Sequence, residues 1–367
     1  MLLKQMFDEL PHFLDANVPV EIGSAPGAGK SESIDDLVTR MSNRDGFEWG
    51  IRKIFIATQT PVDLLGYLVP GHAEHKDPST GEITRQRVSE FTMPLWMMSD
   101  KGIPMNHYKR GIVVFEEWDK GEPDTKKSSA EIILNGQAGP WKLHSGIGRI
   151  MLVNRTEDRS GSTKNFDFII NRRAEFTVIA DVEGWREWAL THGIDPLIVA
   201  FASKYPEVVF ANKIPDKQAP FCTPRSLVKL GQVLPKRVDA AGKMKVDSIT
   251  SEIITGMIGQ AAGLQLMAWI KLRHETPDWE DILKDPTGIE IPAKPDAQLM
   301  VCYECAHKVD TKTAAKCVSF IKRLPAQFSV TFAKAAVRRN YDLINTSAFT
   351  DWVSKNSSLL NAIGGAK

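Results

Sequence analysis

The sequence predicts an α/β protein, in which a parallel sheet covered by helices on both faces is followed by an all-helical half. Three observations lead to this prediction. Short, largely apolar runs alternate with helical segments up to about residue 180, a pattern typical of a parallel sheet buried on both faces. A glycine-rich turn joins the first apolar run to the helix that follows it. Beyond residue 180, apolar residues recur mainly at helical spacing.

The predicted strands are short and largely apolar. In chain order they cover residues 18–22, 53–58, 112–115, 150–153 and 176–179. The first 23 residues contain an amphipathic helical pattern. Another helix is predicted over residues 31–41, where Ile34, Leu37 and Met41 share one face.

The second half contains a series of helical patterns. The predicted helices cover residues 182–192, 196–203, 224–234, 249–272, 297–307, 311–323, 326–340 and 347–356. The segment 273–295 is polar and contains proline, so we expect it to be a surface connection.

Composition limits the class of protein. A chain of 367 residues suggests two or three domains, and 43% hydrophobic with 25% charged residues is ordinary for a soluble globular protein. The net charge of +1 provides no electrostatic argument for nucleic-acid or membrane binding. No run reaches the ~20 apolar residues of a membrane span, and the N-terminus lacks a signal-peptide pattern.

Four cysteines are too few for a disulfide framework in a chain of this length, so we predict a cytoplasmic protein with reduced thiols. Cys302 and Cys305 have the spacing of a metal or redox pair. No second pair follows at ligand spacing, and the segment is helical, so these cysteines are predicted to be structural.

Residues 24–31 form a glycine-rich segment between a strand and a helix, and end in Lys-Ser, an order typical of a phosphate-binding P-loop. Gly27 and Gly29 let the backbone turn its N–H groups inward. Lys30 would reach the β- and γ-phosphates, and Ser31 would hold Mg²⁺. The chain is therefore predicted to be a P-loop αβα sandwich that binds ATP and Mg²⁺. The predicted cofactor-binding residues here are Ser24, Ala25, Pro26, Gly27, Ala28, Gly29, Lys30, Ser31 and Glu32.

This segment departs from the usual pattern at its first position, where Ser24 replaces glycine and Gly23 stands one residue too early. Serine can still make the turn. The alternative interpretation is a glycine-rich turn that binds nothing.

Paired acids follow the apolar run at residues 112–115. Glu116 is predicted to support the Mg²⁺ site together with Ser31, and Glu117 to orient and activate the attacking water. The usual first acid of this motif is aspartate, so Glu116 is a second departure. A solvated acidic turn is the alternative.

At this point the chain resembles the AAA+ ATPases, and within them the MoxR-like branch, over about residues 10–235. Residues 60–66 (TPVDLLG) are similar to a stretch after the second strand of that branch. Residues 91–95 (FTMPL) are similar to the following segment, which leads to a helix before the Walker B strand. The pieces also occur in the order of that family.

The resemblance implies roles for polar residues further along the chain. Asn154 resembles the sensor 1 residue, and Arg172 or Arg173 the arginine finger, with Arg172 favoured. Arg225 resembles the sensor 2 residue that binds the nucleotide from the lid. The alternatives are that the two arginines pair with local acids such as Glu175, and that Arg225 is a surface residue.

The resemblance also implies a domain division and an assembly. Residues 1–180 would form the nucleotide-binding AAA+ core, residues 181–272 a helical lid and residues 273–367 a C-terminal helical region. Subunits would form a hexameric ring. The protein would be of phage or bacterial origin, and a phage-encoded protein would act in the host cytoplasm.

The expected function is an ATPase that remodels a protein partner in the manner of a chaperone, with a von Willebrand A-type protein as a candidate partner. The alternatives are a nucleic-acid motor, such as a phage or plasmid helicase or translocase, and a nucleotide-gated scaffold without turnover. Residues 72–87 and a predicted hairpin at 136–148 are candidate substrate contacts, with Trp141 as an exposed aromatic.

Overall fold

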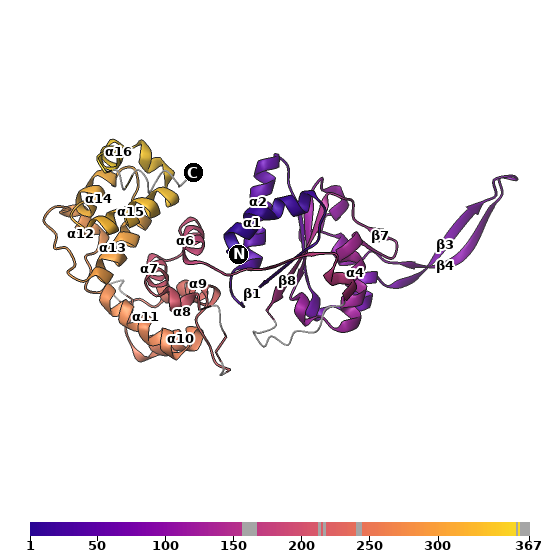
Figure 1. The fold of residues 1–367 in the computed structure, drawn as a ribbon, viewed down its shortest axis with the longest axis horizontal. Helices are drawn as coiled ribbons and strands as arrows, with labels where there is room; N and C mark the ends of the chain where they lie inside the picture. The colour runs from indigo at the N-terminus through magenta and orange to yellow at the C-terminus, as the bar shows by residue number, and fades with distance from the viewer. Residues whose placement is uncertain (156–166, 212–213, 216–217, 240–243, 357–358, 360–367) are drawn as a thin grey trace. The chain divides into compact units, whose positions relative to one another are not determined.

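The computed structural model describes residues 1–155, 167–211, 214–215, 218–239, 244–356 and 359. The chain divides into two compact units, residues 1–179 and 180–367 (Figure 1). The first unit contains every strand of the described residues, and the second is helical. Each unit is described by itself below.

A five-stranded parallel sheet forms the centre of the first unit, with strand order β2-β5-β8-β1-β9. Its strands are β1 (Val20–Ser24), β2 (Gly50–Phe55), β5 (Gly111–Glu116), β8 (Ile147–Asn154) and β9 (Ala174–Thr177). The five predicted strands are therefore confirmed, with ends that shift by a few residues. Because β8 lies between β1 and β5, the segments after these three strands meet at one edge of the sheet.

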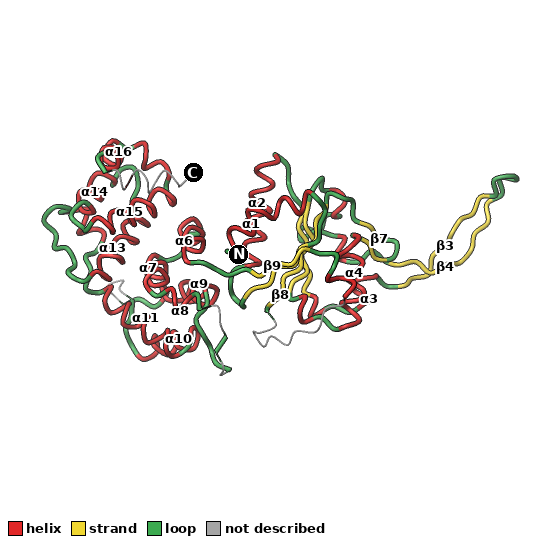
Figure 2. Tube along the Cα trace, viewed as in Figure 1, coloured by secondary structure: helices red, strands yellow, loops and turns green. Residues whose placement is uncertain are grey.

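Helices cover both faces of the sheet, as Figure 2 shows. The helices of this unit are α1 (Leu3–Asp15), α2 (Lys30–Asp45), α3 (Pro61–Leu65), α4 (Pro123–Asn135) and α5 (Asp167–Ile170). Side chains alternate along the strands, so Ile112 and Val114 pack with α1 and α2, whereas Val113 and Phe115 pack with α3 and α4. This arrangement is the three-layer αβα sandwich of the P-loop fold, as predicted.

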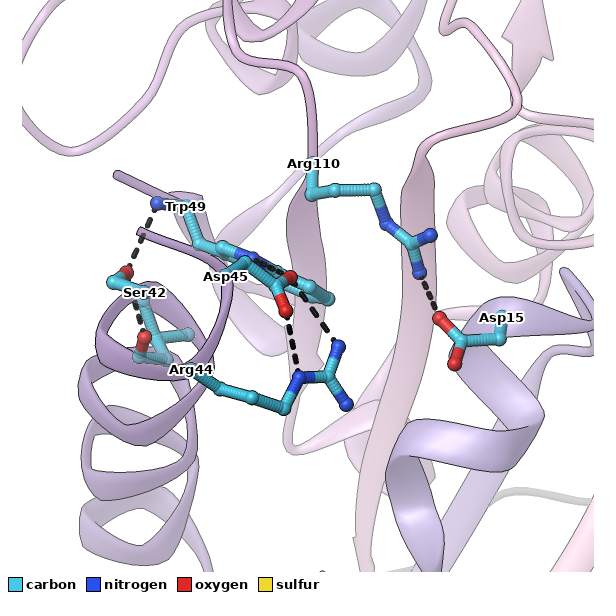
Figure 3. Close-up of polar contacts among 7 residues, drawn as sticks. Asp15, Ser42, Arg44, Asp45, Trp49 and Arg110 are labelled. Atoms are coloured by element: carbon cyan, nitrogen blue, oxygen red, sulfur yellow. Dashed lines mark hydrogen bonds and ion pairs between the residues drawn. The ribbon is translucent and has the colours of Figure 1, made fainter. Parts of the chain in front are cut away.

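Charged and aromatic side chains fasten the amino edge of the sheet to the ends of α1 and α2 (Figure 3). Arg110, just before β5, forms an ion pair of 2.5 Å with Asp15 and lies 5.0 Å over the Trp49 ring. The Trp49 indole N–H donates to Asp45 at 2.9 Å. Hydrogen bonds from Arg44, first among several causes, lower the pKa of Asp45. These contacts all lie at the amino edge of the sheet, and the glycine-rich loop lies at the opposite, carboxyl edge.

The first unit also contains two antiparallel hairpins outside the central sheet. The strands β3 (Leu68–Lys76) and β4 (Ile83–Phe91) pair antiparallel and project from the sheet, almost entirely exposed (Figure 1). The second pairs β6 (Gln137–Ala138) with β7 (Trp141–Lys142), which confirms the hairpin predicted there. Trp141 was expected to be an exposed aromatic, and this was wrong, because its ring packs against the hydrophobic core.

The resemblance led us to expect a helix shortly before the Walker B strand. Among the described residues between β4 and β5, the chain forms two short 3-10 turns instead, Leu95–Met97 and Met105–His107. Pro94 and Pro104 precede these turns, and proline favours the start of a turn but not the continuation of a helix. Trp96 and Met105 still pack into the core.

The second unit consists of helices around one hydrophobic core. They are α6 (Val182–Thr191), α7 (Pro196–Lys204), α8 (Pro206–Val209), α9 (Pro224–Val233), α10 (Ser248–Ile258), α11 (Gln260–Arg273), α12 (Trp279–Lys284), α13 (Pro295–Lys308), α14 (Ala314–Ile321), α15 (Ala326–Arg339) and α16 (Ser347–Ser354). The buried residues of this cluster come from elements between Ala189 and Leu359. Residues on both sides of position 272 thus share a single core.

Two predictions for this unit were wrong in detail. Residues 249–272 form two helices, because Gly259 has φ of 83° and ends α10. A Cβ at this glycine would lie 2.3 Å from the Pro220 carbonyl oxygen, so the break is built into the packing. The expected surface connection at 273–295 contains α12, whose Trp279 and Ile282 are buried in the core.

None of the helices within the described residues is both long and apolar enough to cross a membrane. Cys302, Cys305 and Cys317 are buried in the second unit without disulfides. Burial raises the pKa of the Cys302 and Cys305 thiols well above the ordinary value, which fits inert core cysteines.

Candidate phosphate-binding site

The turn between β1 and α2 has the backbone of an anion-binding loop. Gly27 and Gly29 both have positive φ, of 76° and 95°, which non-glycine residues rarely adopt. Gly29 is the N-cap of α2, so the first N–H groups of this helix point toward the loop. A helix amino terminus preceded by such a turn attracts negatively charged oxygen atoms.

The loop lysine is held by the first residue of the loop. The Lys30 ammonium donates a hydrogen bond of 2.7 Å to the Ser24 hydroxyl and lies 3.5 Å from the Ser24 carbonyl oxygen. Both residues are buried. Ser24 thus supplies a hydroxyl where the usual loop has glycine, and it makes the turn while binding the lysine.

The loop serine and the first acid after β5 are in direct contact. Ser31 Oγ donates a hydrogen bond of 3.0 Å to Glu116 Oε2. Glu116 is the last residue of β5 and is buried. Two oxygen donors that lie side by side at a phosphate-binding loop match the ligand preference of Mg²⁺.

The second acid has an unusual backbone. Glu117 lies in the left-handed region with φ of 52°, which few non-glycine residues adopt and which often marks functional sites. Its carboxylate lies 3.2 Å from the Lys120 ammonium in a partly exposed pair. The two consecutive carboxylates therefore have different partners: Glu116 accepts a hydrogen bond from Ser31, whereas Glu117 pairs with Lys120.

The predicted sensor residue also lies at this edge. Asn154 is the last residue of β8, and its register partner on β1 is Ser24. The Asn154 backbone N–H donates to Asp119 Oδ1 at 3.1 Å. The structure therefore brings Ser24, Lys30, Ser31, Glu116 and Asn154 together at the carboxyl ends of three adjacent strands.

The two candidate arginines precede β9 and differ in their surroundings. Arg173 forms an ion pair of 3.0 Å with Glu21 and one of 2.7 Å with Glu175, and its side chain is 1% exposed. The ion pair with Glu175 is the local pairing that the alternative interpretation predicted, and a role of Arg173 as the finger stays a prediction. Arg172 is exposed, and its role as the finger stays a prediction.

Glu32 and Arg225 were also predicted to contact the nucleotide. Glu32 is exposed in the first turn of α2, where its backbone N–H belongs to the helix terminus but its carboxylate would repel phosphate. Arg225 is exposed in the first turn of α9, after the capping residue Thr223. It belongs to the second unit, and its contact with nucleotide stays a prediction.

Sequence reasoning missed the charged residues that surround the acids. Asp119, Lys120 and Lys126 all follow the acidic pair, but a charge near a strand end is ordinarily interpreted as a solvated one. The available signal was Trp118, which places an aromatic residue between the acids and favours a buried turn.

The first unit therefore has the P-loop fold: a parallel αβα sheet with a glycine-rich turn after β1 and a carboxylate after β5 that meets the helix following this turn. No protein-family model and no curated protein sequence matches the chain.

Solved structures that align with this chain have low sequence identity to it. A RuvB variant from Thermotoga maritima has 12% identity and a TM-score of 0.38 over 78% of this chain and 75% of that one. NtrX from Brucella abortus has 13% identity and a TM-score of 0.31 over 100% of this chain and 68% of that one. Similarity this low is uninformative about activity, so the function is inferred from the residues of the site.

Proposed function

We propose that this chain is an ATP-hydrolysing P-loop ATPase of the AAA+ class. The contact between Ser31 and Glu116 carries the proposal. It places the hydroxyl of the phosphate loop against the carboxylate of the neighbouring motif, which is the pairing that a Mg²⁺-nucleotide site requires. A glycine-rich turn that binds nothing would have no use for a buried carboxylate at this point.

Each residue of the site then has a task. The loop N–H groups, the α2 terminus and Lys30 would bind the phosphates and offset their charge. Ser31 and Glu116 would hold Mg²⁺, which neutralises the charge that develops on the phosphate oxygens. Glu117 is the candidate base that orients the attacking water, and it must leave Lys120 to reach that water.

The position of Arg172 supports assembly into a ring. Arg172 precedes β9, whose first residue, Ala174, pairs with Val20 at the start of β1. The phosphate loop follows the opposite end of β1, so Arg172 lies at the amino edge of the sheet, away from the loop of its own subunit. If Arg172 completes a site, that site belongs to a neighbouring copy.

We therefore propose a homo-oligomeric ring, a hexamer by resemblance to the MoxR-like branch, that uses ATP to remodel a protein partner. A von Willebrand A-type protein is the candidate partner by the same resemblance. The exposed β3–β4 hairpin offers surface for such a contact.

Turnover assays test the proposal. Purified protein should release phosphate from ATP in the presence of Mg²⁺, Lys30→Ala should lose nucleotide binding, and Glu117→Gln should bind ATP without turnover. Micromolar ATP binding retained in Lys30→Ala would contradict the loop assignment. A rate that rises with single-stranded or duplex DNA at physiological salt would instead favour a nucleic-acid motor. Trapping of a protein by Glu117→Gln with ATP would identify the partner.

A further inference from the structure

Several charged side chains lie buried in the first unit, and four of them act on one another electrostatically. Glu21, Asp119 and Lys126 are 4%, 5% and 0% exposed, and the Arg173 side chain is 1% exposed. Glu21 alternates on β1 with Val20 and Ile22, which face α1 and α2, so its side chain faces the α4 side. Two acids and two bases balance, and buried charges are stable only when compensated in this way.

Asp119 connects two segments of the site. It follows Glu117 by two residues in the 3-10 turn Trp118–Lys120, and its Oδ1 accepts the backbone N–H of Asn154 at 3.1 Å. Since β5 and β8 are adjacent strands, this bond fixes the turn that carries Glu117 to the strand end that carries Asn154.

Lys126 is the counter-charge of this carboxylate. It lies on α4, and its Nζ is 5.5 Å from the centroid of the Trp118 ring. Burial lowers the pKa of the Lys126 ammonium, and the negative charges of Asp119 and Glu21 oppose that effect. The acids therefore help to keep the lysine charged inside the protein.

Glu21 extends the cluster toward the start of β1. It is the second residue of β1, three positions before Ser24. Arg173 Nη2 donates a hydrogen bond of 3.0 Å to Glu21 Oε1, and Arg173 Nε lies 3.0 Å from Glu21 Oε2. The negative charge of Glu21 acts on Lys126 together with that of Asp119, so the buried charges link the middle of the sheet to the turn after β5.

We propose that Asp119 is a positioning residue of this site: it holds Asn154 and Glu117 in the mutual arrangement that water attack requires, and Lys126 holds Asp119. This inference depends on the proposed ATPase function. Asp119 acts through the Asn154 N–H and the turn, and it does not touch the phosphates.

Two variants of Asp119 separate the hydrogen bond from the charge. Asp119→Ala removes the acceptor and should lower kcat roughly 100-fold, as expected when a reacting group is misplaced by about 1 Å. Asp119→Asn retains an oxygen acceptor of the same size and should recover part of that loss. Nucleotide affinity should stay nearly unchanged in both. An unchanged kcat in Asp119→Ala, or a loss of affinity as large as the loss of rate, would overturn the proposal.

Hydrogen exchange at the Asn154 amide gives a readout that does not depend on turnover. Exchange should be faster in Asp119→Ala and close to wild type in Asp119→Asn. Exchange as slow in Asp119→Ala as in wild type would refute the role of Asp119. A wild-type chain that hydrolyses no ATP would refute the ATPase function instead, so the two failures are distinguishable.

The neighbouring lysines offer a matched control on one helix. Lys126→Met retains the apolar stem of a buried side chain, and Lys127→Met makes the same change at an exposed position. Lys126→Met should lower kcat at least about tenfold through the displaced Asp119. Lys127→Met should leave kcat as it is. Equal rates for the two variants would contradict the part assigned to Lys126.

Discussion

The Ser31 hydroxyl donates a 3.0 Å hydrogen bond to Glu116, a residue 85 positions further along the chain. The contact exists because β8 alone separates β1 from β5, so the segments after β1 and β5 converge. It also accounts for glutamate where aspartate is usual, since the longer side chain reaches the serine directly.

Removal of this hydroxyl should weaken the proposed Mg²⁺ site. In Ser31→Ala, we expect the Mg²⁺ concentration for half-maximal ATPase rate to rise at least about tenfold, because one of two adjacent oxygen ligands is lost. Titration of the rate with Mg²⁺ at fixed ATP measures this. Ser33→Ala is the control, because Ser33 Oγ donates to the Gly29 carbonyl oxygen of the same helix. A similar shift in both variants would point to a general effect on α2.

The Ser24 hydroxyl should restrain nucleotide binding. Lys30 must leave Ser24 to reach a phosphate, so Ser24→Ala should tighten ATP binding by up to about tenfold, the equivalent of a charged hydrogen bond worth about 1.5 kcal/mol. Equilibrium binding of a fluorescent ATP analogue reports the change. Weaker binding would mean that the hydroxyl contacts the nucleotide itself.

Arg172→Ala should leave ATP binding nearly intact and lower the rate by roughly 10³-fold or more, the effect of losing an arginine finger. Mixing it with Glu117→Gln subunits, inactive alone but with an intact Arg172, should restore turnover at sites where Glu117→Gln supplies the arginine. Failure of any mixing ratio to restore activity would argue against a finger that acts between subunits.

Arg173→Met should destabilise the first unit by about 3 kcal/mol, because Glu21 is left buried without its counter-charge. Burial already raises the pKa of Glu21 above 4.5, Glu175 adds to this, and Arg173 and Lys126 oppose it. Without Arg173 the folded pKa rises further. A carboxyl that binds its proton more tightly when folded loses stability as pH increases, so the deficit should be larger at about pH 8 than at about pH 5.

Urea unfolding at the two pH values measures this difference. Glu21→Gln combined with Arg173→Met removes both charges and should recover most of the loss. A deficit that is independent of pH would show that the lost packing of the arginine stem is responsible.

Two glycines near the end of α10 should respond in opposite ways to alanine. Gly259→Ala places a Cβ 2.3 Å from the Pro220 carbonyl oxygen at φ of 83°, so we expect a loss of at least about 1 kcal/mol. Gly256 lies within the same helix, and a Cβ there meets no atom within 4 Å. Gly256→Ala should stabilise the unit by about 0.5–1 kcal/mol. Thermal unfolding of the two variants compares them directly.

The sequence predicted the strands and the loop because their signals are local. An apolar run, a glycine pair and a Lys-Ser dipeptide each depend on neighbouring residues, and β1, β5 and the turn before α2 were found from these. The break at Gly259 depends on Pro220, and the burial of α12 depends on distant helices, so neither leaves a local pattern. The contacts of Arg173 with Glu21 and of Asp119 with Asn154 are also long-range, which is why the sequence left both arginines as finger candidates and the aspartate was overlooked.

The β3–β4 hairpin can tolerate changes in sequence and length. None of the hairpin's residues, all of which the structure describes, belongs to a core cluster, and both outer edges of the hairpin remain open. Charged side chains such as Lys76 and Arg87 discourage these edges from pairing with other chains. The hairpin can therefore lengthen, shorten or exchange its side chains without disturbing the sheet that carries the candidate phosphate-binding loop, which leaves it open to rapid divergence.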